Sequence, residues 1–159
     1  MINENFSQML RESLIKHWDL PAFSDYKGET LTYGDVAKEI NRLHVLFEKL
    51  GVNPSDKIAL LGRNSSRWGV VYLATILYGA IIVPILPDFH VDDFHHIVNH
   101  SDATLLFVSD PIYEKIDEDK MSGLSAIFSL TDFQLIHAPK KAVQKAVDKT
   151  DAHVEENKH

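Results

Sequence analysis

Short, uninterrupted apolar runs alternate with longer amphipathic segments along most of this chain. Four runs have the length of strands and lie at 57–61, 80–84, 104–108 and 125–130. A strand without polar alternation is typical of a parallel sheet whose two faces are both covered by helices. The helical segments between the runs would form right-handed crossovers. The sequence therefore predicts an α/β fold with a doubly wound, mainly parallel sheet and helices on both faces.

A helix and a small hairpin are predicted ahead of this sheet. The helix would present one apolar stripe, made of Phe6, Met9, Leu10, Leu14 and Trp18. The segments 22–26 and 30–32 then flank a turn that contains Gly28, which is typical of a hairpin.

The segment 33–50 carries the strongest local helix signal. Thr32 can cap its N-terminus, and Asp35 stands three residues later in the position of a capping box. Its apolar residues are spaced four and three apart and would share one face, namely Val36, Ile40, Leu43, Phe47 and Leu50. Gly51 would end the helix. Further helices are predicted over 65–78 and 92–100, and a short one opens at Asp110-Pro111, where Asp110 would be the N-cap.

The composition of the sequence changes after Leu130. The last twenty residues are mostly charged, and Ala142, Val143, Ala146 and Val147 form only a thin apolar stripe. No further strand is expected after Leu130. We therefore divide the chain into an N-terminal α/β subdomain, 1–130, and a partly helical, mobile linker or tail, 131–159.

Composition excludes several functions. The formal net charge is −7, with 23 acidic and 16 basic residues, which disfavours nucleic acid as a partner. There is no cysteine, so disulfides, thiolate metal sites and a cysteine nucleophile are excluded. The first residues have neither a basic start nor an apolar core, so a secretory signal is not expected. A cytoplasmic location is predicted.

The segment 68–86 contains no charged residue, and its length approaches that of a membrane-spanning helix. Gly79 and Pro84 interrupt it, and residues 81–83 are β-branched. A helix followed by a buried strand explains these features better than a membrane span.

The stretch from Leu61 to Ser66 lies between a predicted strand and a predicted helix, where α/β sheets often bind anions. The seven glycines form no phosphate-binding motif, since no two of them are two positions apart. Asn64 or Ser65 as a helix N-cap, with Gly62 in the turn, is the simpler interpretation.

Asp92, His96 and His100 are spaced four apart and would share one face of a helix. A carboxylate and imidazoles are zinc ligands, but the three positions spread over about 12 Å along the axis. Only adjacent pairs could share one ion, so a solvated helix face is the simpler interpretation.

Nucleophilic and phosphorelay chemistry find little support. No glycines bracket a serine as a nucleophile elbow requires, and His137 falls in a weakly structured region. A receiver domain would need an acidic cluster at its strand ends, and only Asp110 is so placed.

Five segments in register resemble AMP-forming acyl-CoA synthetases and related adenylating enzymes. Residues 31–36 resemble the family's "TYxEL" opening, and 50–60 its "LGVxxGDrVAl" segment. Asn64, Ser65 and Trp68 match "NsxeW", residues 74–87 match "lAxxxaGavxvPlxP", and 101–108 match "sgAkvlfv". One departure is Ser55, which replaces the usual glycine before Asp56.

The resemblance implies an N-terminal fragment of a long-chain fatty-acid–CoA ligase. In that family a carboxylate reacts with ATP to give an acyl-adenylate and pyrophosphate, and the thiol of coenzyme A then displaces AMP. The full-length family uses ATP, Mg²⁺ and coenzyme A, and none of these is expected to bind to this fragment. The catalytic loops would lie downstream of His159, so no catalytic, cofactor-binding or metal residue is assigned and the fragment alone is expected to be inactive.

The expected partners are the downstream subdomains of the same polypeptide, a fatty acid in the full enzyme, and further copies of the fragment through exposed apolar surface. Two alternatives remain open. One is a free-standing, non-catalytic α/β binding or regulatory module. The other is a metal-binding protein that uses His96 and His100.

Overall fold

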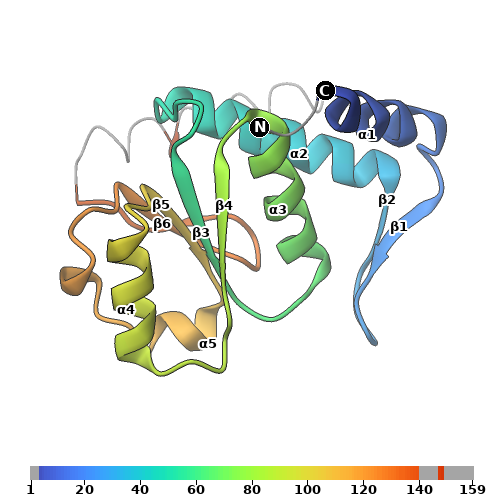
Figure 1. Ribbon diagram of the computed structural model, residues 1–159. Helices are drawn as coiled ribbons and strands as arrows, with labels where there is room; N and C mark the ends of the chain where they lie inside the picture. The colour runs from blue at the N-terminus through green and yellow to red at the C-terminus, as the bar shows by residue number, and fades with distance from the viewer. Residues whose placement is uncertain (1–3, 140–146, 149–159) are drawn as a thin grey trace.

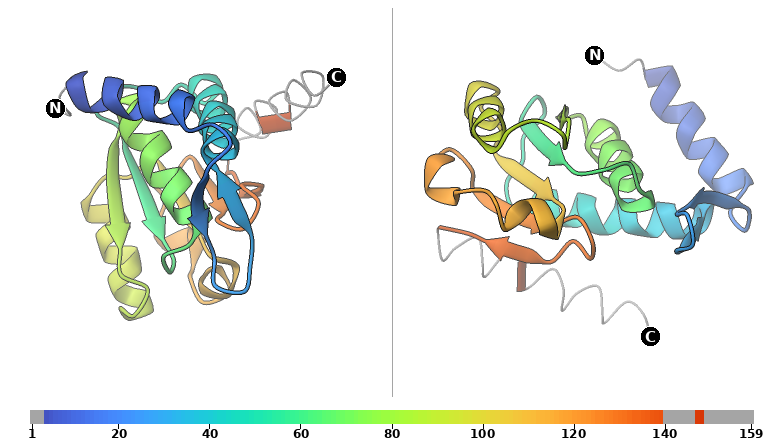
Figure 2. Two further views of the ribbon diagram at one scale, coloured as in Figure 1. Left: turned by 90° about the vertical axis from the view of Figure 1, so that its right-hand side faces the viewer. Right: turned by 90° about the horizontal axis from the view of Figure 1, so that it is seen from below.

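The computed structural model describes residues 4–139 and 147–148, and it contains one five-stranded sheet covered by helices on both faces (Figures 1 and 2). The strands lie side by side in the order β4 (Ile81–Ile85), β3 (Lys57–Leu61), β5 (Leu105–Val108), β6 (Ala126–Ser129) and β7 (Leu135–His137). The first three pairs of neighbours are parallel. The doubly wound α/β fold predicted from the apolar runs is therefore confirmed.

Two apolar cores lie on opposite faces of the sheet. Ile58 and Leu60 of β3 point toward α2 (Tyr33–Lys49) and α3 (Ser66–Tyr78). Ala59 and Leu61 point toward α4 (Val91–His100) and the short α5 (Asp110–Tyr113). Because successive side chains of a strand point to opposite faces, one continuous apolar run contributes to both cores.

The helix α2 forms as its capping signal predicts. The N–H of Asp35 donates to the Thr32 hydroxyl at 3.1 Å, and the N–H of Thr32 donates to the Asp35 carboxylate at 2.9 Å. These two bonds hold the pKa of Asp35 below its usual value. The helix reaches its C-cap at Leu50, and Gly51 follows with a φ of 71°, as predicted. Leu46 joins the buried face, whereas Leu50 is only half-buried.

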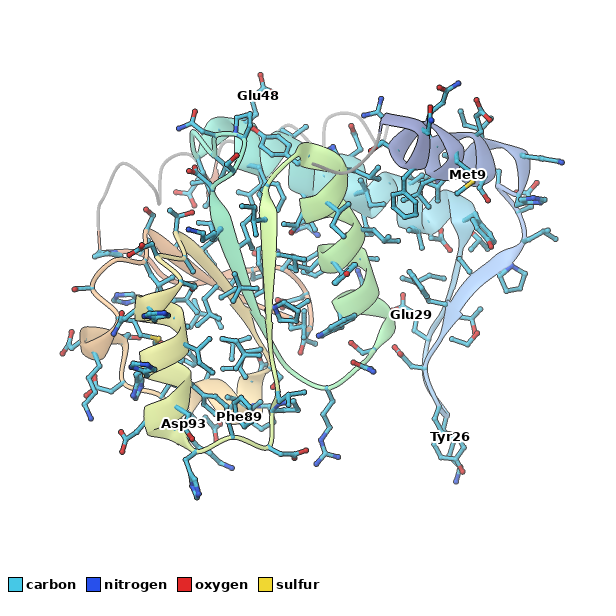
Figure 3. All side chains as sticks on the ribbon, viewed as in Figure 1. Met9, Tyr26, Glu29, Glu48, Phe89 and Asp93 are labelled. Carbon is cyan, nitrogen blue, oxygen red and sulfur yellow. The ribbon has the colours of Figure 1, made fainter. Side chains whose placement is uncertain are left out.

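The helix α1 (Glu4–Lys16) buries less of its apolar stripe than predicted. Leu14 is buried and Leu10 packs against the same core. Phe6 is 42% exposed, and Met9, which is labelled on α1 in Figure 3, is 61% exposed. The helix lies on α2 beyond the end of the sheet, so only one edge of the stripe finds apolar neighbours (Figure 1).

The predicted hairpin consists of β1 (Pro21–Ser24) and β2 (Thr30–Thr32), which pair antiparallel. Two glycines allow aromatic rings to approach the helices closely. A Cβ on Gly69 of α3 would lie 2.9 Å from the Phe23 ring, and a Cβ on Gly34 of α2 would lie 2.6 Å from the Trp18 indole. Phe23 thus packs the hairpin against α3, while Trp18, just before the hairpin, packs against α2; the hairpin is a sheet of its own beside the main sheet.

The segment 68–86 divides at Gly79, whose φ of 90° ends α3 before β4 begins. Within the described part of the chain, no helix has the length and apolarity that crossing a membrane requires. The helix–strand interpretation is confirmed, but the prediction that the strand is buried is wrong. The strand β4 lies at the edge of the sheet, with Ile81 45% exposed.

Pro84 fits this edge position. The N–H of Ile81 donates toward the β3 side, to the carbonyl of Asp56. Alternate residues of a strand direct their backbone polar groups to opposite sides, so the nitrogen of Pro84 faces the open edge. Its missing N–H therefore removes no ladder hydrogen bond.

The prediction of no strand after Leu130 is also wrong, because β7 pairs antiparallel with β6. The turn between them contains Phe133, which has a φ of 61° and a side chain only 3% exposed. The turn carries no glycine, and β7 is three residues long, so its sequence signal is weak. The predicted helix and mobile tail lie outside the described residues from 140 on, apart from Val147 and Asp148.

Candidate functional site

A pocket of about 660 Å³ opens at the carboxyl ends of β3 and β5. The chain enters the sheet at β3, then places β4 on one side of it and β5 on the other. Ligands of open α/β sheets bind at this kind of switch point, outside the carboxyl ends of the strands. The pocket is lined by loops after β3, β4 and β5 and by the hairpin. Its charged lining residues are Asp25, Glu29, Arg63, Arg67, Asp88 and Lys115.

The N-terminus of α3 faces this pocket, but a carboxylate of the same chain already occupies it. The Asp25 carboxylate accepts the N–H of Ser66 at 2.8 Å and the Ser66 hydroxyl at 2.7 Å. The Ser65 hydroxyl accepts the N–H of Trp68 at 3.1 Å, which makes Ser65 the N-cap. The capping interpretation of residues 61–66 is therefore confirmed. A ligand phosphate would have to displace Asp25 from this helix end.

The basic residues of the pocket differ in how far they are neutralised. Arg67 lies 3.2 Å from the Glu29 carboxylate and 3.5 Å from that of Glu39. Arg63 and Lys115 are exposed, and neither forms an ion pair with any residue that the structure describes. These two cations are available to an anionic ligand at the mouth of the pocket.

Asp110 links the carboxyl ends of β5 and β6. Its carboxylate accepts the Ser129 hydroxyl at 2.7 Å and lies 3.4 Å from the Thr131 hydroxyl. The N-cap of α5 is Ser109, so the prediction that Asp110 caps this helix is wrong. Thr131 lines the pocket, so Asp110 helps to hold this part of the pocket wall in place.

The histidines of α4 do not assemble a metal site. His96 and His100 share a face as predicted, with ring centroids 5.7 Å apart. Asp92 instead approaches His95, at 3.9 Å from its Nδ1. No group of three or more candidate ligands gathers in the described ranges 4–139 and 147–148.

His137 lies in β7, although the sequence suggested a weakly structured region. Its Nδ1 is 3.2 Å from the Glu118 carboxylate, which also accepts the Tyr113 hydroxyl at 2.5 Å. Burial, and then the bond to Glu118, raise the pKa of Tyr113 to about 12. The three side chains tie β7, α5 and the short helix η1 (Glu118–Lys120) together away from the pocket.

Sequence reasoning missed Asp25, Lys115, Glu118 and His95. Asp25 and Ser66 are 41 positions apart, so no local pattern indicates their contact. His95 could have been recognised, because it stands between Phe94 and Val98 on the buried face of α4.

Comparison with known proteins gives the family. Residues 10–158 match the family of AMP-binding enzymes. The chain belongs to this family, and its relatives include synthases and CoA ligases.

Surfactin synthase subunit 2 of Bacillus subtilis is 31% identical over 105 residues, which are 66% of this chain and 3% of that protein. Crotonobetaine/carnitine–CoA ligase of Proteus mirabilis is 31% identical over 109 residues, 67% of this chain and 21% of that ligase. The chain therefore spans about a fifth or less of these curated relatives.

Solved structures show the same fold. The anthranilate CoA ligase AuaEII, in complex with anthranoyl-AMP, superposes with a TM-score of 0.70 at 22% identity, over 77% of this chain and 24% of that one. A benzoate CoA ligase from Burkholderia xenovorans gives a TM-score of 0.71 at 19% identity, over 90% of this chain and 28% of that one. The α/β domain described above is thus the fold found in part of these ligases.

Proposed function

We propose that this chain is the N-terminal part of an ATP-dependent, AMP-forming ligase that activates a carboxylic acid and transfers it to a thiol. The family match over residues 10–158 carries this proposal. A carboxylate oxygen of the acid would attack the α-phosphate of ATP and release pyrophosphate. The thiolate of coenzyme A would then attack the acyl carbon and release AMP. Mg²⁺ would offset phosphate charge in the first step.

A long-chain fatty acid is the proposed substrate. One relative, from Streptomyces coeruleorubidus, is a fatty acid–[acyl-carrier-protein] ligase, 30% identical over 57% of this chain. The names of other relatives specify different acids, so substrate choice needs its own test.

Within the full enzyme, residues 1–130 would act as a scaffold subdomain, and the pocket at the carboxyl ends would form one wall of the ligand cleft. Arg63 and Lys115 support this role, because they place two unneutralised cations at the mouth. No catalytic role is proposed for any residue of this chain. A cytoplasmic location stays a prediction.

ATP–pyrophosphate exchange tests the catalytic proposal. We expect no exchange with the purified 159-residue chain. A polypeptide extended through the downstream family loops should show exchange that depends on an added carboxylate, and long-chain acids should be preferred in a panel. Exchange by the short chain alone would refute its inactivity, and no exchange by the extended protein with any acid would refute the ligase proposal.

The free-standing module is the second candidate, and the apolar edge at β4 distinguishes it from a fragment. Ile81, Leu86 and Phe89 are 45%, 62% and 42% exposed, and Phe89 lies on the loop between β4 and α4 (Figure 3). Such a surface favours association with further polypeptide or with other copies. Sedimentation should show concentration-dependent association, which Leu86→Ser should weaken. A monomer at all concentrations would favour the module.

A further inference from the structure

Two hydrogen bonds of different chemistry hold the segment around η1 against α4. The N–H of Asp117 donates to Nε2 of His95 at 2.9 Å. The side-chain amide of Asn99 donates to the carbonyl oxygen of Lys120 at 2.8 Å. An imidazole changes its charge between about pH 5 and 8, whereas an amide side chain does not. Of these two bonds, only the one to His95 has a titratable side chain as its partner.

The bond from Asp117 determines the tautomer of His95. A backbone amide can only donate, so Nε2 must carry a lone pair and the ring proton must lie on Nδ1. The side chain is 7% exposed, and Nδ1 is buried without a hydrogen-bond partner. A buried donor without an acceptor is uncommon in folded proteins because it loses its bonds to water. The Nδ1–H of His95 therefore stays without a hydrogen bond while Nε2 accepts the N–H of Asp117.

We propose that His95 is a proton-sensitive latch whose bond to the N–H of Asp117 opens when its ring becomes positively charged, while the bond from Asn99 still holds Lys120 to α4. A proton taken from solvent would bind Nε2 and place its N–H against the N–H of Asp117. Two donors cannot share a hydrogen bond, so the contact would open. No covalent bond between heavy atoms changes.

The charged groups around His95 act in opposite directions. Asp92, on the same helix, lies 3.9 Å from Nδ1 and favours the charged ring, although its side chain is 91% exposed. Lys120 on η1 lies 3.9 Å from the same Asp92 oxygen and opposes the added charge. The Asp117 carboxylate accepts the N–H of Asp119. In the described structure neither carboxylate is bonded to Nε2, so the N–H of Asp117 is the partner that a charged ring would lose.

The other contacts of η1 do not involve His95. Glu118 is engaged with the Tyr113 hydroxyl and with Nδ1 of His137. These contacts and the bond from Asn99 to the Lys120 carbonyl would persist when the bond between His95 and Asp117 opens. Asp117 stands two positions after Lys115, the last residue of this segment that lines the pocket. The bond that opens therefore lies next to the pocket in the chain, although residues 117–120 do not line it.

Amide hydrogen exchange of the Asp117 N–H, measured by NMR and corrected for the intrinsic pH dependence, tests the latch. In the native chain we expect protection to fall about tenfold or more as the pH is lowered across the general range of imidazoles, from about pH 8 to 5. His95→Gln should retain an acceptor that does not titrate, so protection should stay constant. His137→Gln should leave the native pH response in place.

Unchanged protection of Asp117 in the native chain would overturn the proposal, as would an equal loss in the His95→Gln variant. A second measurement needs no variant. The ¹⁵N shifts of the His95 ring at neutral pH should report a proton on Nδ1 and none on Nε2, and the reverse assignment would also overturn it.

Discussion

Replacing Asp25 tests whether the hairpin is anchored through the N-terminus of α3. The carboxylate accepts two hydrogen bonds from Ser66, at 2.8 and 2.7 Å, and Ser66 is only 2% exposed. A hydrogen bond to a charged group contributes about 1.5–3 kcal/mol, and a negative charge at a helix N-terminus contributes about 0.3–1 kcal/mol. Because Asp25 is half-buried, we take the lower end of both ranges. Asp25→Ala should therefore lower the free energy of unfolding by about 2–3 kcal/mol.

Urea unfolding would measure this loss as a lower midpoint at an unchanged slope. For a chain of this length the melting temperature should fall by about 4–12 °C. Asp25→Asn keeps one acceptor but removes the charge, so it should lose about 1–2 kcal/mol. In a double-mutant cycle with Ser66→Ala, the coupling energy should exceed about 1 kcal/mol.

Glu29→Gln is the matched control, since it removes a carboxylate of the same hairpin that forms an exposed ion pair with Arg67. Exposed pairs contribute about 0–1 kcal/mol. If Asp25→Ala costs no more than this control and the coupling to Ser66 is near zero, the anchoring argument is refuted.

Three further substitutions test the packing, the protonation and the backbone of the fold. Phe47 is fully buried and packs edge-to-face on two aromatic rings, so Phe47→Ala should cost about 3–5 kcal/mol in urea unfolding; a loss below 1 kcal/mol would contradict it. Burial lowers the pKa of His44, although the bond of its ring to the Ala74 carbonyl opposes this shift. The contribution of His44 to the free energy of unfolding is therefore complete above the unfolded pKa of about 6.5 and is lost as the pH falls below it. His44→Gln should flatten the loss of stability on acidification, and an unchanged pH profile would refute this. Ser55 has a φ of 72° where the family usually has glycine, so Ser55→Gly should raise the melting temperature through a gain of about 0.5–1 kcal/mol, and a decrease would count against strain at this position.

Local signals in the sequence were sufficient to predict the long helices and the class of fold. The capping box of Thr32 and Asp35 and the terminal Gly51 bounded α2, because the groups involved are within a few residues of one another. The apolar runs identified four of the five strands of the main sheet in the described part of the chain. Five short segments in register pointed to the family, and residues 10–158 match it.

The candidate site was harder to predict, because its groups come from distant segments. The pocket joins the hairpin to the ends of β3 and β5, and the contact of Asp25 with Ser66 crosses 41 positions. The sequence correctly gave Ser65 a capping role, yet it could not indicate that a carboxylate from the hairpin fills the same helix end.

The sequence by itself determined the alternation of strand and helix, the capping of α2 and the family, since each depends on chemistry between near neighbours. Only the tertiary structure decided that β4 is an edge strand, that β7 adds to the sheet, and that His95 is buried with one unpaired nitrogen. An apolar run has the same composition at the centre of a sheet and at its edge. Its position depends on which strands pair across long separations in the chain, and that choice is made by the packing of the whole domain.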